Sequence, residues 1–234
     1  MITVKKDAIK FRNSEGNMQS AGVLCEVGVM NGCEWVDYIR STQSMFVGVE
    51  FPDGYELELN LPNVDMENAS NKAVILSSAF AYTTGIKKVK LILNYSSEWV
   101  FNIGYMFRSS SSLEEVDFLW NEINLKNATW CFDSCKKLKV IKAYLNFSAH
   151  SSSANNYTFY NCSALEEVRI VSNTIFKSIN FAQSPLLSDE SIQSIIDGLA
   201  TVETSQTLTF HADVKAKLTE EQISQITSKN WTLA

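Results

Sequence analysis

The stretch most suggestive of a metal or redox site is CFDSCKKLKVIKA, residues 131–143. Two cysteines, an aspartate and several lysines lie close together there. Thiolates bind zinc and act as redox nucleophiles, so Cys131 and Cys135 are the first candidates for a metal or redox site. They do not have the two-residue spacing of a zinc knuckle. Five cysteines in 234 residues also differ from the dense, even-numbered frameworks of small secreted domains. We therefore expect buried free thiols rather than a metal site or a Cys135–Cys162 disulfide.

Catalytic motifs are sparse in this sequence. The chain has 2 histidines, His150 in the polar stretch SAHSSSANN and His211 after a predicted strand, so histidine catalysis has few candidates. A glycine-rich phosphate loop, a Gly-x-Ser-x-Gly elbow and a His-Glu-x-x-His helix are all missing. Acidic pairs recur at one phase of the repeat described below, which indicates solvated strand starts: Glu114-Glu115 and Glu166-Glu167. We expect a protein without enzymatic activity, cofactor or metal.

Composition and charge limit the expected partners. Hydrophobic residues make up 45% of the chain and charged residues 20%, as in folded soluble proteins of one or two domains. The formal net charge is -6 and no run of Lys or Arg exceeds two, so we expect no nucleic-acid partner. The opening residues lack the apolar stretch of a secretory signal, and no window approaches the roughly 20 apolar residues that cross a bilayer. We expect no membrane insertion; the location suggested is a virion or an extracellular surface.

One pattern occurs four times along the middle of the chain. Each copy has a phenylalanine followed by apolar residues at positions +6, +9 and +11, and the phenylalanines are 27, 25 and 27 residues apart. With 13 phenylalanines in a chain that is 45% hydrophobic, about one such match would occur by chance. The copies are Phe80/Ile86/Val89/Leu91, Phe107/Leu113/Val116/Phe118, Phe132/Leu138/Ile141/Ala143 and Phe159/Leu165/Val168/Ile170. A fifth copy fades after Phe181 and Leu187, because Glu190 breaks the next interval.

The repeat predicts both the fold and the role of the cysteines. Positions +9 and +11 lie on one side of a strand, and one repeat is too small to bury its apolar side alone, so successive repeats must stack. Stacked strands at this period form a parallel sheet along a solenoid, so the predicted fold class is an α/β repeat protein. Position +3 is always small, as if it packs against its equivalents in neighbouring repeats: Thr83, Ser110, Cys135, Cys162 and Ser184.

The lines CFDSCKKLKVI and TFYNCSALEEV resemble the BspA-like leucine-rich repeats of bacteria and their phages, over about residues 79–187. Ala143 departs from the family pattern, which usually has a larger residue there, and the connections after the strands vary in length. The opening MITVKKDAIKFRNSEG and the closing LTEEQISQITSKNWTLA are similar to segments of phage tail-associated proteins that carry such repeats. The resemblance implies a leucine-rich-repeat solenoid of about four to five coils that binds a ligand or host surface, without enzymatic activity.

Residues 1–75 precede the repeats and are expected to form a small β-rich unit. Polarity alternates over residues 47–61 on both sides of Pro52-Asp53-Gly54, which predicts a β-hairpin. Two further strands are expected around Asn13 to Gly16. This unit would cover the open end of the repeats, which are expected over residues 76–187.

Residues 188–234 follow the repeats and are expected to form an α/β cap with a polar outer surface. Ser188, followed by two acidic residues, predicts a helix start. A second helix is predicted by the capping box of Thr219 and Gln222. Short strands are expected at residues 207–210 and 231–233.

Two outward columns of the predicted strands are candidate binding residues. The +10 column mixes both signs of charge, which favours cross-strand pairing worth up to about 1 kcal/mol per pair: Lys90, Asp117, Lys142 and Arg169. The +12 column would form an exposed apolar line, typical of an interface, unless a loop or the N-terminal unit covers it: Ile92, Leu119, Tyr144 and Val171. Aromatic residues in the connections either add binding platforms or pack in the core: Trp120, Trp130 and Tyr157.

These observations favour a non-catalytic binding or structural protein. The first hypothesis is a phage or prophage tail-associated protein that contacts a protein or glycan on the host surface, or another virion protein. The alternative is a bacterial cell-surface or secreted adhesin, and a hydrolase with a hidden site is a third. The genes beside a tail protein would be tail and lysis genes, whereas an adhesin would neighbour an export system.

Overall fold

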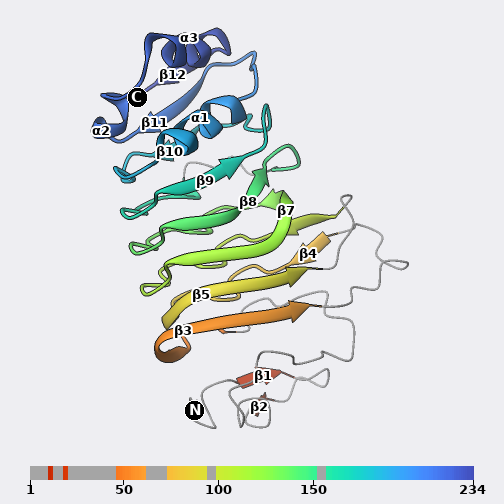
Figure 1. Ribbon diagram of the computed structural model, residues 1–234. Helices are drawn as coiled ribbons and strands as arrows, with labels where there is room; N and C mark the ends of the chain where they lie inside the picture. The colour runs from red at the N-terminus through yellow and green to blue at the C-terminus, as the bar shows by residue number, and fades with distance from the viewer. Residues whose placement is uncertain (1–9, 13–17, 21–45, 62–72, 94–98, 152–156) are drawn as a thin grey trace.

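The computed structural model describes residues 10–12, 18–20, 46–61, 73–93, 99–151 and 157–234. In Figure 1 the strands lie one above another from β3 near the bottom to β12 near the top, and the helices gather at the C-terminal end. The fold is a curled parallel β-sheet with few helices, which gives the chain an α/β character. No helix in the described part of the chain is long and apolar enough to cross a membrane.

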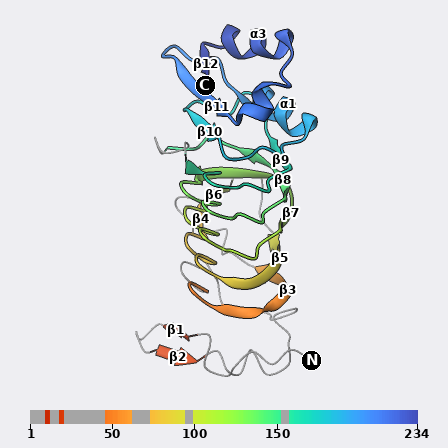
Figure 2. The same cartoon turned by 90° about the vertical axis from the view of Figure 1, so that its left-hand side faces the viewer.

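The main sheet has seven strands in two strips. The larger strip pairs β3, β5, β7, β8 and β9 in parallel and comprises Glu50–Leu61, Thr84–Leu93, Glu115–Asn127, Val140–Asn146 and Glu167–Ile170. The smaller strip pairs β4 with β6 and comprises Ala73–Ile75 and Val100–Asn102. Strand β7 belongs to both strips, because its start pairs with β5, its residues up to Asn124 pair with β8, and its end pairs with β6. The sheet therefore curls at β7, with β4 and β6 on one side and β3 and β5 on the other (Figure 2).

A ladder of stacked phenylalanine rings runs through the core. Neighbouring ring centroids are 4.8 to 6.0 Å apart, which is a favourable separation for aromatic pairs. The buried rings belong to Phe46, Phe80, Phe107, Phe132, Phe159, Phe181 and Phe210. The +6, +9 and +11 residues of all four predicted repeats are buried as well, from Ile86 to Ile170, which confirms their place in the core. Burying one such side chain contributes roughly 1.5–3 kcal/mol.

The +3 residues form a second internal row, which confirms that they pack between repeats. Thr83 Oγ1 lies 3.0 Å from Ser110 Oγ of the next repeat. Three members also donate to the carbonyl oxygen of the preceding ladder phenylalanine: Ser110 to Phe80, Cys135 to Phe107 and Cys162 to Phe132. The same carbonyl oxygens also accept a main-chain N–H from their own turn, so the side-chain bond is an additional one that links neighbouring repeats. A small side chain that can donate suits this position in both space and hydrogen bonding.

The predicted hairpin at residues 47–61 is wrong. Glu50–Leu61 forms a single strand, β3, which pairs in parallel with β5 and has register irregularities near Tyr55. The expected turn residues produce a local irregularity rather than a chain reversal. The parallel arrangement is favoured because Phe46, Tyr55 and Leu57 occupy the 0, +9 and +11 positions of the repeat and are buried with it. The stack thus begins at least as early as Phe46.

Close approach of β3 and β5 requires a glycine at one point. Gly85 has a φ of +79°, and a Cβ at this position would lie 1.8 Å from the carbonyl oxygen of Phe51. Only a residue without a side chain fits between the two strands in this conformation. Gly85 therefore permits the first step of the stack, from β3 to β5.

The predicted C-terminal helices are confirmed. Helix α1 (Asp189–Gly198) begins after Ser188, whose side chain accepts a hydrogen bond from the third residue of the helix. Helix α3 (Glu220–Ser228) begins with the expected capping box at Thr219. Such caps satisfy main-chain donors that have no partner within the helix.

Short strands complete both ends of the chain. The two expected N-terminal strands are confirmed as an antiparallel pair, β1 (Lys10–Arg12) and β2 (Met18–Ser20). The C-terminal strands pair in parallel and include both predicted ones: β10 (Ile179–Phe181), β11 (Gln206–Phe210) and β12 (Trp231–Leu233). Helix α2 (Ala212–Lys215) was not expected from the sequence. It is a single turn capped by His211, whose Nδ1 accepts a hydrogen bond from the main chain.

Candidate functional site

The charged +10 column lies on the outer face of the larger strip. Lys90, Asp117 and Lys142 are aligned on β5, β7 and β8, as predicted. The predicted pairing among them is wrong, because Lys142 Nζ lies 2.7 Å from Glu115 Oε1. Lys90 Nζ likewise pairs with Glu58 Oε2, at 3.2 Å. The Asp117 carboxylate instead accepts a hydrogen bond from a main-chain N–H two residues later in β7.

Further ion pairs neutralise the lysines of this face. The pairs are Lys88–Glu56 at 3.3 Å, Lys139–Glu114 at 3.4 Å and Lys87–Glu114 at 3.9 Å. The hydrogen bond to Glu115 raises the pKa of Lys142. Exposed pairs contribute about 0–1 kcal/mol each, so they affect the charge pattern more than the stability. A shallow depression of 300 Å³ lies here, and paired charges line most of it. Most charges on this part of the face are already neutralised by an ion pair and are therefore less available to a ligand.

The apolar +12 column is not a continuous line, so that prediction is wrong. Strand β7 contains extra residues relative to β8, and Tyr144 is therefore aligned with Glu122 and not with Leu119. Leu119 has a φ of +44°, which is uncommon for a leucine. The predicted exposure is confirmed for Leu119 at 42% and Tyr144 at 45%. Val171 is half-buried, and the side chain of Ile92 lies outside the described residues.

One place brings residues of both predicted columns together. A register shift between β8 and β9 aligns Tyr144 with Arg169, and Arg169 Cζ lies 5.9 Å from the centroid of the Tyr144 ring. This distance suits a cation–π contact. The two residues line a pocket of 500 Å³ with the first turns of α1. We name it the helix-corner pocket, and its residues are Tyr144, Glu167, Arg169, Ser188, Glu190, Ser191 and Ser194.

The serines of the helix-corner pocket are engaged by the main chain, whereas its charged groups are not paired. Ser191 Oγ donates to the carbonyl oxygen of Glu166, and Ser194 Oγ accepts from the N–H of Ile170. These bonds attach α1 to β9 and fix the wall of the pocket. Three charged residues form no ion pair with any residue that the structure describes: Glu167, Arg169 and Glu190. The pocket presents two carboxylates, one guanidinium and one phenol to a ligand.

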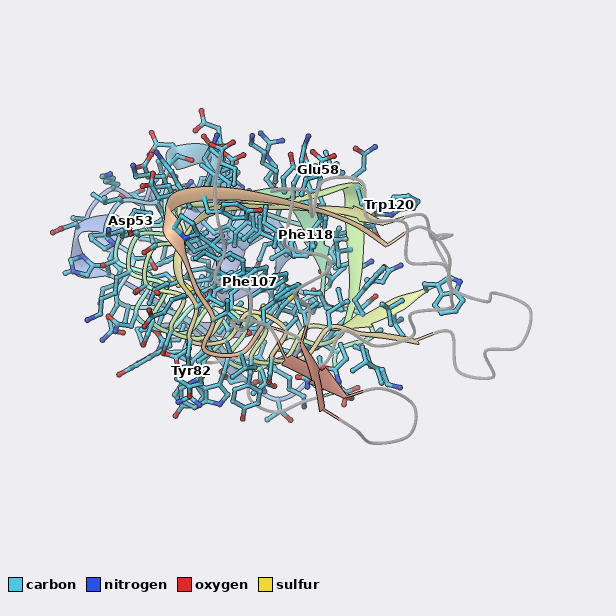
Figure 3. All side chains as sticks on the ribbon, turned by 90° about the horizontal axis from the view of Figure 1, so that it is seen from below. Asp53, Glu58, Tyr82, Phe107, Phe118 and Trp120 are labelled. Atoms are coloured by element: carbon cyan, nitrogen blue, oxygen red, sulfur yellow. The ribbon has the colours of Figure 1, made fainter. Side chains whose placement is uncertain are left out.

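A second candidate surface lies on the opposite side of the core, where the chain turns between the two strips. Figure 3 shows Tyr82 there, across the molecule from Glu58, with Phe107 between them. Trp130 and Tyr157, for which the sequence left binding platform and core packing as alternatives, stack face to face with ring centroids 4.1 Å apart and planes at 1°. Each of these two rings therefore covers one face of the other.

The remaining residues of this turn-side surface were not predicted. They are Tyr82, Tyr105, Arg108 and Tyr160. A signal existed, because Tyr105, Trp130 and Tyr157 each come two residues before a ladder phenylalanine. The repeat pattern contained only buried positions, so this outer position was not included. Trp120 is half-buried and packs against the core, which agrees with core packing, one of the two alternatives given for it.

The residues that first suggested chemistry have structural roles. Cys131, Cys135 and Cys162 are buried free thiols, as expected, and burial raises the pKa of each. His150 Nε2 accepts a hydrogen bond from the N–H of Ala128, at 2.9 Å. Within the described ranges, no group of three or more His, Cys, Asp or Glu side chains could hold a metal ion. Cys25 and Cys33, for which the sequence predicts neither pairing nor separation, lie outside those ranges.

Comparisons with protein-family models, with curated proteins and with solved structures gave no match. The two candidate sites, the helix-corner pocket and the turn-side surface, therefore rest on the geometry of this chain alone. They lie on opposite sides of the phenylalanine ladder, so a ligand at one does not contact the other.

Proposed function

We propose that this chain is a non-catalytic recognition protein built as a leucine-rich-repeat solenoid, and that it binds a glycan on a host cell surface as part of a phage or prophage tail. Support for the solenoid comes from the phenylalanine ladder, the parallel pairing of successive strands and the +3 row that joins each repeat to the next. A rigid stack of this kind holds side chains of successive repeats at fixed positions on one surface. The similarity of both end segments to phage tail-associated proteins supports the tail setting.

The observation that carries ligand binding is the set of charged groups beside Tyr144 in the helix-corner pocket that have no ion-pair partner among the described residues. Carboxylates accept hydrogen bonds from sugar hydroxyls, and a guanidinium donates to sugar oxygens. Glu167, Glu190 and Arg169 supply both kinds of group. The exposed ring of Tyr144 offers an apolar face to the C–H groups of a pyranose. The volume of 500 Å³ lies within the roughly 300–1,000 Å³ typical of small-molecule sites.

A protein ligand on the sheet face is less well supported. Protein interfaces have a contiguous core from which charged residues are depleted. The apolar line that would have supplied such a core is interrupted between Leu119 and Tyr144. Ion-paired lysines and glutamates occupy the face from β3 to β8. Recognition of a small, hydroxyl-rich unit at one pocket fits this surface better than a broad protein contact.

The test is binding to an array of bacterial envelope glycans, combined with a turnover assay on each glycan that binds. Tyr144→Ala and Arg169→Gln should each lower the affinity for the bound glycan by about tenfold or more, because a ring face or a charged donor is lost. Lys90→Gln is the matched control, since Lys90 lies on the same face but is already paired with Glu58. We expect that variant to bind as the wild type does.

Two results would overturn the proposal. Release of sugar fragments by the purified protein would show that it is an enzyme. Equal loss of affinity in Lys90→Gln and Arg169→Gln would place the ligand elsewhere on the face or show a non-specific charge effect. Melting temperatures of all variants are compared first, so that a folding defect is not taken for a binding defect.

A further inference from the structure

Arg108, on the turn-side surface, is surrounded by three aromatic rings. Its Cζ atom lies 5.9 Å from the ring centroid of Tyr82, 5.6 Å from that of Tyr105 and 5.2 Å from that of Trp130. The rings come from three successive turns of the stack, so only the folded chain brings them together. Cation–π contacts of this kind hold a guanidinium in one orientation. We name this group of four residues the Arg108 cage.

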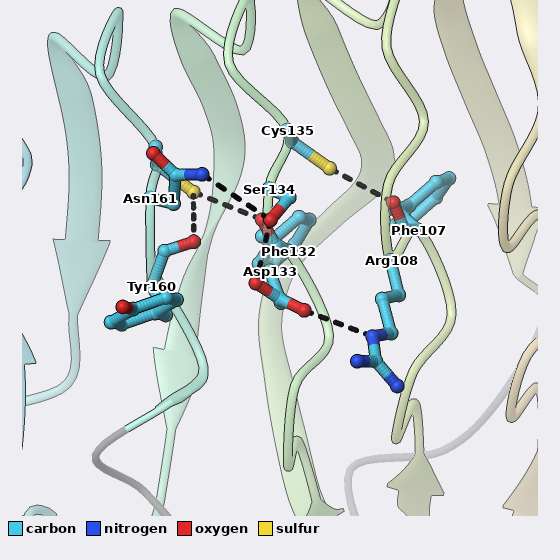
Figure 4. A network of polar contacts seen from close by, with 9 residues as sticks. Phe107, Arg108, Phe132, Asp133, Ser134, Cys135, Tyr160 and Asn161 are labelled. Carbon is cyan, nitrogen blue, oxygen red and sulfur yellow. Dashed lines mark hydrogen bonds and ion pairs between the residues drawn. The ribbon is translucent and has the colours of Figure 1, made fainter.

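Asp133 fixes the guanidinium from one side only. Arg108 Nε donates to Asp133 Oδ2 at 2.9 Å, and Asp133 in turn accepts from Ser134 Oγ through its other oxygen. Figure 4 shows both terminal nitrogens of Arg108 pointing away from Asp133. Neither terminal nitrogen is hydrogen-bonded to a residue in the described part of the chain. Because two parallel N–H donors match a carboxylate, Arg108 retains the fork that binds one end-on.

The cage residues adopt a backbone conformation that does not favour aromatic side chains. Tyr82, Tyr105 and Trp130 have φ values of 59°, 59° and 57°. In the four repeats a positive φ recurs two residues before or after the phenylalanine, and smaller residues also adopt it there: Ser78, Ser109, Ser134 and Asn161. Asparagine adopts positive φ far more readily than tyrosine or tryptophan does. The aromatic side chains at these three positions are therefore explained by what they surround and not by the turn.

An open pocket of 360 Å³ lies directly beside the cage. It is lined by Val47, Ser78, Ala81, Tyr82, Tyr105 and Arg108, of which Arg108 is the only charged residue. A ligand in it would meet two tyrosine rings, their hydroxyl groups and the guanidinium fork.

The main chain of the pocket offers no edge to an extended peptide. The N–H groups of its lining residues other than Val47 are used between or within turns: Ser78 to Gly104, Ala81 to Ser78, Tyr82 to Arg108, Tyr105 to Thr129 and Arg108 to Tyr105. Peptides that bind as added strands need such groups to be free. Recognition here must use side chains, and ring faces with one charged fork suit an acidic sugar better than a peptide.

We propose that the Arg108 cage and the adjoining pocket form a second binding site, which takes the carboxylate of an acidic sugar. The Arg108 fork binds the carboxylate, and the rings of Tyr82 and Tyr105 contact the C–H groups of the sugar. Arg108 and Asp133 together carry no net charge, so the attraction for a carboxylate comes from the two terminal N–H donors of Arg108 and suits no more than one negative charge. The site goes beyond the proposed function, since it shares no residue with the helix-corner pocket.

The test is an NMR titration with methyl β-D-glucuronide and methyl β-D-glucoside, which differ only in a carboxylate and a hydroxymethyl group. We expect the glucuronide to bind about tenfold more tightly, with shifts at Tyr82 and Tyr105, and to weaken as salt is raised. Arg108→Lys keeps a positive charge beside the buried Asp133 but removes the fork, so it should lower the glucuronide affinity about tenfold. Tyr82→Asn should also weaken binding, and its fold is preserved because Asn161 occupies the equivalent position.

Controls separate this site from the other. Tyr144→Ala should bind the glucuronide as the wild type does, so a failure of the helix-corner pocket leaves this proposal unaffected. Equal affinities for the two glycosides, or an unchanged affinity in Arg108→Lys, would overturn the carboxylate assignment. Tighter binding of a short amidated and acetylated Glu-Glu peptide than of the glucuronide would overturn the sugar assignment.

Discussion

Two rows of aromatic rings run side by side on the turn side of the molecule, only two residues apart in each repeat. The inner row consists of the ladder phenylalanines, whose rings are buried and stack on one another. The outer row contains exposed or half-buried rings, with Tyr82 exposed by 50%. The outer rings are Tyr82, Tyr105, Trp130 and Tyr157.

The difference between the rows teaches that an aromatic residue on a repeat does not have one role. An inner ring is surrounded on all sides and holds successive turns together through burial. Most of the outer rings adopt positive φ, which costs roughly 1–2 kcal/mol for a residue with a bulky side chain. The inner row therefore stabilises the stack. The outer row adds little to stability, and its rings are instead available for contacts at the surface.

The largest effect is expected from the inner row. Phe159→Ala should lower the free energy of unfolding by roughly 3–5 kcal/mol, because the cavity lies between Phe132 and Phe181 in the ladder and cannot collapse freely. Urea denaturation measures the change. Tyr157→Ala is the matched outer-row variant, and a loss as large as that of Phe159→Ala would remove the distinction between the rows.

A smaller effect is expected from the thiols that lie beside the inner row. Burial raises the pKa of Cys135, so the folded state keeps the thiol protonated while the unfolded state ionises near pH 8.5. The stabilisation is complete below that pH and is lost as the pH rises above it, by about 1.4 kcal/mol per unit for one thiol. Urea denaturation at pH 7, 9 and 10 should show a weaker decline for Cys135→Ser than for the wild type.

Serine is the suitable replacement because Ser110 and Ser184 occupy the same +3 position and donate similar hydrogen bonds. Identical pH dependence in the variant and the wild type would show that Cys135 is not protected in the folded state. Such a result would contradict the burial of Cys135 away from water in the folded state.

The smallest effect on stability is expected from the outer row itself. Tyr82→Asn relieves the strain of a tyrosine at positive φ but loses the contact with Arg108, worth roughly 0.5–1 kcal/mol. The free energy of unfolding should therefore change by less than about 1 kcal/mol in either direction. Thermal unfolding measures it. A loss of several kcal/mol would mean that Tyr82 belongs to the structural row.

The sequence alone located the buried positions of the repeat because burial recurs at fixed intervals. Phe46 shows the limit of that reasoning, since Pro52 replaces the apolar +6 residue and the alternating pattern of residues 47–61 also fits a hairpin. Choosing between the two arrangements requires the long-range contact with Phe80, which no local pattern contains. The cap was easier to predict, because the capping residues at Ser188 and Thr219 act within their own helices.

The candidate sites were predictable only in part. Exposure of Tyr144 and Leu119 follows from strand alternation, which is a local property. The residues that lie beside them on neighbouring strands cannot be predicted in this way, because a single β-bulge shifts every later residue pair along the strand. Extra residues in β7 separate Leu119 from Tyr144, and the shift between β8 and β9 brings Arg169 to Tyr144.

The sequence by itself determined the repeat, the buried rows and the helix caps, because each depends on residue type at short, fixed spacing. Only the tertiary structure decided which surface groups meet. Arg108 and its three rings come from three turns of the chain. The charged groups gathered at the helix-corner pocket depend on the register of β8, β9 and α1. Binding surfaces are made of contacts between turns, and the free energies that set their register are summed over the whole stack.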